Sequence, residues 1–135
     1  MAVFPSEEWL TTFVDKLNSD QHYAQMAQNW EGDMNFIILP SGKLAEQVNI
    51  YLDLWHGKCR EAYMMDNLDQ QKPPVFTLQA TYDNYVRIIK GEIDPMQAML
   101  TRKLNVKGNM AYMLRNVSVV LDFVRCLREV TDTFQ

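Results

Sequence analysis

Few side chains in this chain of 135 residues are of types that do chemistry, and none is spaced for it. The two histidines, His22 and His56, are far apart in the sequence, so capping or solvated roles are favoured over a metal pair. The two cysteines, Cys59 and Cys126, lack CxxC spacing and are expected to be reduced thiols packed as small hydrophobic groups. No phosphate-binding loop, dinucleotide glycine fingerprint, nucleophile elbow or zinc motif occurs. We therefore expect a protein that is not an enzyme and that uses no cofactor or metal.

Methionine is the residue type that stands out, with nine among 135 residues. A thioether side chain is flexible and polarizable, so it suits an adaptable apolar surface better than a tightly fitted core. Four of these residues, Met96, Met99, Met110 and Met113, lie on two helical segments that flank a short predicted strand. Two interpretations are open here: the methionines line an apolar binding cavity, or they fill an ordinary core.

The composition is that of one globular domain over residues 1–135, with 47% apolar and 22% charged residues. A net charge of −4 argues against nucleic acid as a partner. Transient contact with an anionic membrane surface stays open, because basic residues stand at Arg102, Lys103, Lys107 and Arg115. The longest apolar run, 36–39, is too short to span a membrane, and the start of the chain has no secretory signal pattern. We expect a cytoplasmic protein without stable membrane insertion.

Periodicity and turn signals predict helices at the start, a hairpin-built sheet, and then helices alternating with further strands. The predicted strands cover 33–40, 48–56, 59–66, 75–80 and 104–107, with a loop over 67–74. A long uninterrupted helix is predicted over 110–130, since neither Gly nor Pro breaks its apolar stripe. This order favours an α+β domain with helices against one face of the sheet.

The predicted hairpin turns at 56–57 and sets Asp53 opposite Arg60 on its polar face. That register puts Glu61 on the apolar face, beside Tyr63, whereas a three-residue loop with a bulge would reverse the faces of the second strand. Two interpretations of Glu61 follow: it pairs with the headgroup of a ligand, or it lies near the sheet margin and reaches water. The second is favoured.

The segment 82–115 contains Gly-Glu-Ile-Asp-Pro and, further on, Leu-Thr-Arg-Lys-Leu-Asn-Val-Lys-Gly-Asn-Met. This pattern resembles the sterol carrier protein-2 (SCP2) family, closely over the second half of the chain and loosely over the first. The matching positions are Gly91, Pro95, Ala98, Leu104, Gly108 and Asn109, with looser agreement at Asp53, Leu54, Gly57 and Lys58. One position departs: members usually have Gly where Arg102 stands. A side chain there implies a less tight approach or a helix that runs slightly further.

The resemblance implies a five-stranded, mostly antiparallel sheet with helices covering one face and an apolar tunnel between them. It further implies a non-enzymatic carrier that holds a sterol, a fatty acid, a fatty acyl-CoA or a prenyl lipid, with the last helix as a movable lid. The alternative is an interaction or enzyme-accessory module whose filled core docks a partner or forms a homodimer. The residues expected to line the tunnel are Ile50, Leu52, Leu54, Phe76, Leu78, Ile88, Met96, Met99, Leu100, Met113, Leu114, Val117 and Leu121.

Overall fold

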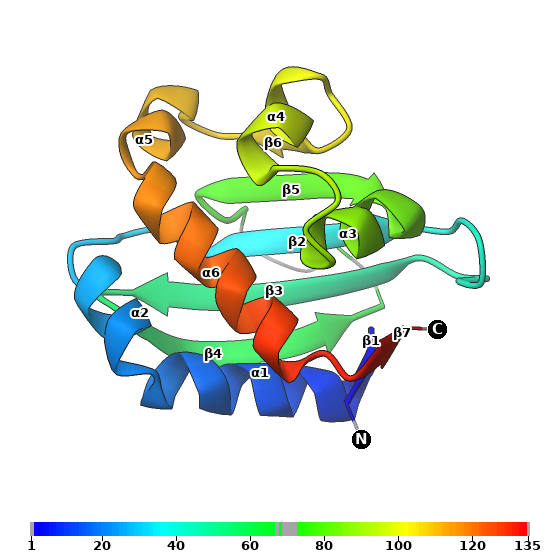
Figure 1. Ribbon diagram of the computed structural model, residues 1–135, viewed down its shortest axis with the longest axis horizontal. Helices are drawn as coiled ribbons and strands as arrows, with labels where there is room; N and C mark the ends of the chain where they lie inside the picture. Colours follow the sequence, from blue (N-terminus) through cyan, green and yellow to red (C-terminus); the bar gives the residue numbers. More distant parts are fainter. Residues whose placement is uncertain (1, 67, 69–72, 135) are drawn as a thin grey trace.

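The computed structural model describes residues 2–66, 68 and 73–134, so most of the loop predicted over 67–74 lies outside the described residues. The elements follow one another along the chain in an order that Figure 1 traces by colour. They are β1 (Val3–Phe4), α1 (Glu7–Ser19), α2 (Gln21–Met26), β2 (Met34–Leu39), β3 (Val48–Trp55), β4 (Lys58–Met65), β5 (Phe76–Thr81), α3 (Tyr82–Ile89), α4 (Pro95–Leu100), β6 (Asn105–Lys107), α5 (Met110–Arg115), α6 (Val117–Val130) and β7 (Thr133–Phe134).

Five of these strands form one sheet in the order β4-β3-β2-β5-β6. Only β2 and β5 run parallel within that sheet, and its other neighbours are antiparallel. The helices lie on one face of the sheet, with α6 crossing its middle (Figure 1). The short strands β1 and β7 pair with each other and bring the two ends of the chain together. The predicted fold class, α+β with a five-stranded mostly antiparallel sheet, is confirmed.

Within the described part of the chain, five helices begin at a residue whose side-chain oxygen accepts a hydrogen bond from the backbone N–H three residues on. These residues are Ser6, Asp20, Thr81, Asp94 and Asn109. Such a bond satisfies one of the N–H groups that a helix leaves unpaired at its start. The helix starts were therefore readable from local sequence alone.

The uninterrupted helix predicted over 110–130 is wrong, because the chain breaks it at Asn116 into α5 and α6. The Nδ2 group of Asn116 donates to the carbonyl of Tyr112 at 2.8 Å, while the Asn116 backbone N–H turns to Met113 instead. Asparagine side chains compete with the backbone for helical hydrogen bonds in this way. As a result α5 and α6 point in different directions (Figure 1).

The hairpin between β3 and β4 turns at His56 and Gly57, which have φ values of 49° and 81°. Two successive positive φ values are typical of a type I′ turn. Beyond the turn, Arg60 donates to both carboxylate oxygens of Asp53 at 3.0 and 3.1 Å, so the predicted pairing of these two residues is confirmed.

A β-bulge after that pair changes which residues of β4 face the helices. Leu52 is paired with Ala62, so Arg60 and Glu61 together oppose the single residue Asp53. The extra residue shifts the alternation of side chains, and Glu61 is exposed. The expectation that Glu61 lies on the apolar face with Tyr63 is therefore wrong.

Candidate functional site

An apolar cavity lies between the sheet and the helices and has a volume of about 60 Å³. Strands β2, β3 and β5 form its floor, and helices α2 to α6 form its walls and roof. The lining residues are Tyr23, Trp30, Met34, Phe36, Leu54, Leu78, Tyr85, Ile88, Ile89, Pro95, Met99, Leu104, Met113, Val119, Val120, Phe123, Val124 and Leu127.

The polar atoms of two aromatic lining residues, Tyr85 and Trp30, are hydrogen-bonded inside the fold. The hydroxyl of Tyr85 donates to the carbonyl of Leu78 at 3.0 Å, and Nε1 of Trp30 donates to the carbonyl of Gly32 at 2.9 Å. Burial raises the pKa of the Tyr85 hydroxyl, so it stays a protonated donor. These rings therefore present their hydrocarbon surface to the cavity, which favours an apolar ligand.

A second apolar cavity, of about 30 Å³, lies toward α1 and the N-terminal end of the chain. Its lining residues are Phe4, Trp9, Leu10, Phe13, Phe36, Ile38, Ile50, Leu52, Tyr85, Ile89, Phe123 and Leu127. Five side chains line both cavities and so form the partition between them: Phe36, Tyr85, Ile89, Phe123 and Leu127. The apolar space expected between sheet and helices thus exists as two compartments separated only by side chains.

The thirteen predicted tunnel residues fall into three groups. Leu54, Leu78, Ile88, Met99 and Met113 line the larger cavity, and Ile50 and Leu52 line the smaller one. Phe76, Met96 and Val117 line neither, and the Phe76 ring packs against both Trp30 and Tyr112. Leu100, Leu114 and Leu121 also line neither and are 68%, 50% and 43% exposed.

Leu114 and Leu121 face outward although their immediate neighbours Met113 and Val120 line the larger cavity. Neighbouring residues lie about 100° apart round a helix, so both leucines fall at the margin of the apolar stripe. In α6, Val120, Phe123 and Val124 line the cavity. Sequence reasoning did not include the aromatic lining residues Trp30, Phe36, Tyr85 and Phe123. The apolar spacing within 82–89 and 119–127 was the available signal for some of them.

One side of α6 is held to α1 and α2 by a network of ion pairs around Arg125. Its guanidinium contacts Asp20 at 2.7 Å, Asp122 at 2.8 Å and Glu129 at 2.8 Å. Lys16 adds contacts of 3.0 Å to Asp20 and 2.7 Å to Glu129. Hydrogen bonds from Arg125 and from the backbone N–H of Tyr23 hold the pKa of the Asp20 carboxyl well below its ordinary value.

The same network contains a geometric candidate for a metal site. Ligand atoms of Asp20, Asp122 and Cys126 lie within 4.8 Å of one another. The guanidinium of Arg125 already bonds both carboxylates, and burial raises the pKa of the Cys126 thiol to about 11, which disfavours the thiolate that a metal needs. The network therefore acts as a structural clamp between α6 and the first two helices.

The opposite side of α6 borders the segment α4-β6-α5. Within this segment, α4 ends in a Schellman motif. The N–H of Lys103 bonds the carbonyl of Ala98 at 2.9 Å, and the N–H of Arg102 bonds that of Met99 at 3.3 Å. Arg102 has φ 61°, in the left-handed region where glycine is favoured. The Arg102 side chain does not extend α4, because Arg102 adopts the backbone conformation that a glycine would adopt at this position.

Gly108 lets α5 start close against the sheet. Its φ is 140°, and a Cβ atom there would lie 2.5 Å from Cδ1 of Phe76 and 2.9 Å from the carbonyl oxygen of Val75. Any side chain would push the start of α5 away from β5. Glycine is therefore required for the close approach of the start of α5 to β5.

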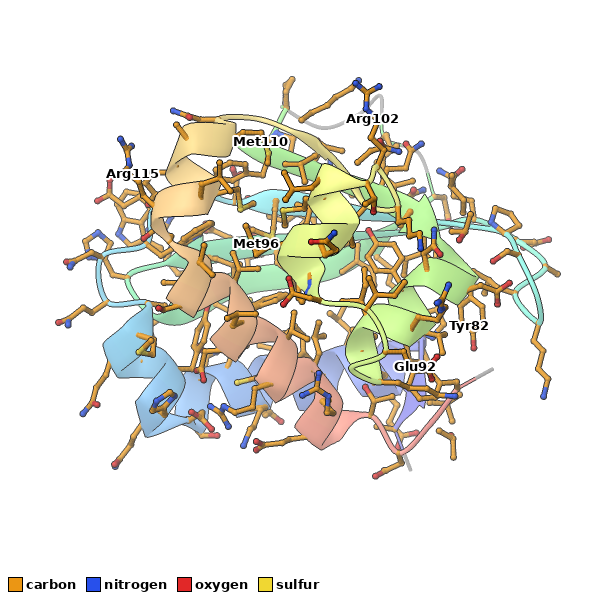
Figure 2. The ribbon with its side chains drawn as sticks, turned by 45° about the horizontal axis from the view of Figure 1, so that its top comes forward. Tyr82, Glu92, Met96, Arg102, Met110 and Arg115 are labelled. Atoms are coloured by element: carbon orange, nitrogen blue, oxygen red, sulfur yellow. The ribbon has the colours of Figure 1, made fainter. Side chains whose placement is uncertain are left out.

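An open groove of about 670 Å³ lies at the β6 edge of the sheet, where residues of β2 and β5 that face away from the helices meet the end of α4 and the start of α5. It is lined by Ile37, Thr77, Gln79, Met99, Arg102, Leu104, Asn105, Val106, Lys107 and Met110. In Figure 2, Arg102 stands beyond the end of α4 and Met110 at the start of α5.

No helix among the described residues is both long and apolar enough to cross a membrane.

Comparisons with known proteins agree with this geometry. Residues 7–121 match the model of the SCP-2 sterol transfer family, so the resemblance seen in the sequence is confirmed. A crystal structure of sterol carrier protein 2 aligns with a TM-score of 0.83 and 27% identity, covering 93% of this chain and 98% of that one. No curated protein sequence matches significantly.

Two further solved structures show the same fold. A protein of Thermus thermophilus, described as a candidate sterol carrier protein, aligns with a TM-score of 0.83 and 26% identity, covering 97% of this chain and 92% of that one. The apo form of sterol carrier protein 2 from Yarrowia lipolytica aligns with a TM-score of 0.61 and 17% identity, covering 95% of each chain.

Proposed function

Because the chain belongs to the SCP-2 sterol transfer family, we propose that it is a non-enzymatic carrier that holds one apolar lipid between its sheet and its helices. The observation that carries this proposal is the pair of apolar cavities, which only side chains separate. The ligand classes that such walls suit are a sterol, a fatty acid, the acyl chain of an acyl-CoA, or a prenyl lipid.

Transfer of hydrocarbon out of water supplies the affinity. Each buried methylene contributes about 0.8 kcal/mol, so a long chain can be held at micromolar affinity after ordering costs. Pockets for organic ligands typically measure about 300–1,000 Å³. Both cavities are far smaller. Loading therefore requires that side chains of the partition rotate and that at least one helix moves outward.

The segment that moves in this proposal is α4-β6-α5. The ion-pair network holds α6 to α1 and α2, and the indole Nε1 of Trp9 donates to Oγ1 of Thr131 at 2.8 Å beyond the end of α6. Helices α4 and α5 have only six residues each, and Asn116 separates α5 from α6. The movable lid is thus assigned to α4 and α5, in place of the long final helix expected from the sequence.

The direct test is native mass spectrometry of the purified protein, followed by extraction and identification of the bound lipid. Displacement of a fluorescent fatty acid then measures affinity. Val120→Trp, which fills the larger cavity, should abolish binding. Leu121→Trp places the same ring on the exposed side of the same helix and should leave it unchanged. Lipid-free protein that displaces no fluorescent fatty acid would contradict the proposal.

The small size of the cavities supports a second candidate function, a module that docks a partner or forms a homodimer. Leu100 and Leu114 are exposed on α4 and α5 and would contribute to such a contact. In that case the protein would purify without lipid, and sedimentation would show a dimer that dissociates on Leu100→Ser and Leu114→Ser substitution.

A further inference from the structure

We infer that β6 is a docking edge, at which an extended acidic segment of a partner protein adds a strand to the five-stranded sheet. That segment bonds the backbone of Val106 and places its acidic side chains beside Arg102 and Lys107. The inference is independent of the proposed carrier function, because Val106, Arg102 and Lys107 line neither internal cavity.

The five-stranded sheet has an open edge at β6. This strand ends the order β4-β3-β2-β5-β6, and within the described part of the chain its residues pair with β5 alone. The other edge is partly covered, since α1 lies along β4 (Figure 1) and the side chain of Asn18 bonds the backbone N–H and C=O of Cys59 at 2.8 and 3.0 Å. An open edge strand is a template for another extended chain.

The hydrogen bonds of β5 fix which of its residues bond to β6. The backbone N–H of Phe76 donates to the carbonyl of Asp33 at 3.1 Å, on the β2 side of the strand. Successive residues of a strand direct their N–H and C=O groups to opposite sides, so Thr77 and Gln79 direct theirs to β6. Leu78, like Phe76, bonds on the β2 side.

As a result, the backbone of Val106 points out of the sheet. Thr77 is paired with Lys107 and Gln79 with Asn105, so these are the two hydrogen-bonded pairs of the ladder. Val106 stands between them and directs its N–H and C=O away from β5. Neither group has a hydrogen-bond partner among the described residues. One donor and one acceptor are thus available to an added strand.

The groove beside β6 reaches both faces of the sheet. Asn105 and Lys107 lie on the face away from the helices, whereas Val106 is paired with Leu78, which lines the larger cavity. All three residues of β6 line the groove, which has a volume of about 670 Å³. An extended chain laid along the edge directs alternate side chains to the two faces, so it fits a groove of this shape.

The lining of the groove determines the chemistry of the added strand. On the helix side, Val106 lies with Met99 and Met110, which suit an apolar side chain of the partner. Arg102 and Lys107 are exposed, and neither has an ion-pair partner among the residues that the structure describes. A segment that alternates acidic and apolar residues therefore matches the groove on both faces.

The charge around β6 favours an acidic partner over a second copy or a bilayer. Residues 95–121 contain four cations and none of the 17 acidic residues of the chain. A second copy docked edge to edge would place two such segments against each other, and like charges on adjacent strands are destabilising. A bilayer surface offers no backbone ladder to Val106. An acidic extended chain satisfies both the backbone and the charges.

The probe for this site is a short fluorescein-labelled peptide of alternating aspartate and valine with blocked ends, and fluorescence anisotropy measures its binding. The same peptide with lysine in place of aspartate is the charge control and should not bind. N-methylation of the peptide removes N–H donors from one set of residues at a time. Methylation of only one set should abolish binding: the valines for an antiparallel strand, the aspartates for a parallel one. Equal effects of the two would overturn strand addition.

Two variants test the site on the protein. Val106→Pro removes the outward N–H and no bond to β5, which an edge strand tolerates, and it should abolish peptide binding. Arg102→Gln combined with Lys107→Gln leaves the backbone unchanged and should weaken binding about tenfold, since two exposed ion pairs are lost. The matched control, Lys43→Gln combined with Lys58→Gln, removes two exposed cations outside the groove and should leave the affinity nearly unchanged.

The outcomes separate this inference from the proposed function. Wild-type protein that displaces a fluorescent fatty acid but does not bind the aspartate peptide would overturn the docking edge and leave the carrier function in place. Peptide binding without fatty-acid displacement would overturn the carrier function alone. Peptide binding that both variants retain in full would place the peptide elsewhere and overturn the docking edge.

Two further measurements identify a different occupant if the peptide does not bind. A wild-type dimer in sedimentation that Val106→Pro dissociates would assign the edge to a second copy. Binding to vesicles of phosphatidylcholine and phosphatidylserine that the double glutamine variant loses would assign the cations to a bilayer. Each of these results overturns the inference.

Discussion

The rings of Phe36 and Phe123 are stacked between the two cavities, with centroids 5.7 Å apart and planes only 4° from parallel. Phe36 comes from β2 and Phe123 from α6, so the pair joins the sheet to the helix layer across the line that a ligand chain would follow. Both rings line both cavities. We expect rotation or removal of either ring to connect the two compartments.

Phe123→Ala should therefore convert the two cavities into one and strengthen lipid binding. The substitution should lower the free energy of unfolding by about 3–5 kcal/mol, as other large-to-small core changes do. It should also raise the affinity for hexadecanoate by roughly threefold to tenfold, because the ligand no longer displaces a ring. Chemical unfolding and fluorescent displacement measure the two effects.

The matched control is Phe76→Ala, which removes an equally large buried ring that lines neither cavity. It should destabilise the protein by a similar amount without tightening binding. If both variants changed the affinity alike, the partition between the cavities would have no role in binding.

Acid should weaken the clamp between α6 and the first helices. The pKa of Asp20 is lowered in the folded protein from its ordinary value of 3.8. Its contribution is fully present above pH 3.8 and is lost as the pH falls further, since the unfolded chain then takes up the proton first. Arg125→Met should cost about 2–3 kcal/mol near neutral pH, because Asp20 and Asp122 lose their shared cation.

The difference between the wild type and Arg125→Met in the free energy of unfolding should shrink as the pH falls below that value. Urea unfolding at a series of pH values measures it. A difference that stays constant down to strong acid would show that the Arg125 side chain stabilises by packing and not by charge.

Both thiols should be unreactive in the native protein. Cys59 and Cys126 are buried, and burial raises the pKa of each to about 11. At neutral pH both are therefore protonated and shielded, whereas the reactive species is an exposed thiolate. A thiol reagent such as Ellman's reagent should label neither residue until denaturant unfolds the chain. Rapid labelling of the native protein at Cys126 would show that the clamp around Arg125 opens readily.

Arg102→Gly should stabilise the protein by about 1 kcal/mol, because a left-handed φ of 61° carries a penalty for any residue with a Cβ. Lys103→Gly is the neighbouring control, since Lys103 has no positive φ, and it should be neutral or destabilising. The shift in the urea midpoint reports both. An equal effect of the two substitutions would mean that the left-handed conformation costs nothing at Arg102. The side chain at this position thus has an energetic cost that a glycine would not have.

The amino-acid sequence by itself determined most of the elements of the main sheet and the helix starts, and it indicated the family. Caps such as Ser6, Thr81 and Asp94 act within three residues of themselves, and the turn at His56 and Gly57 needs only its own backbone conformations. The pattern around Gly91, Pro95 and Gly108 was sufficient to identify the family, because each of these residues meets a local backbone requirement.

Only the tertiary structure decided which side chains meet around the ligand space. The bulge opposite Asp53 exchanged the faces of β4, and the side-chain hydrogen bond of Asn116 accompanies the break between α5 and α6. The bulge adds one residue to a pattern of period two, which turns Glu61 outward although the alternation in the sequence is intact. Packing between elements that are distant in the sequence then set Phe36 of β2 against Phe123 of α6. A contact between residues so far apart in the sequence leaves no signal in the local spacing of apolar residues.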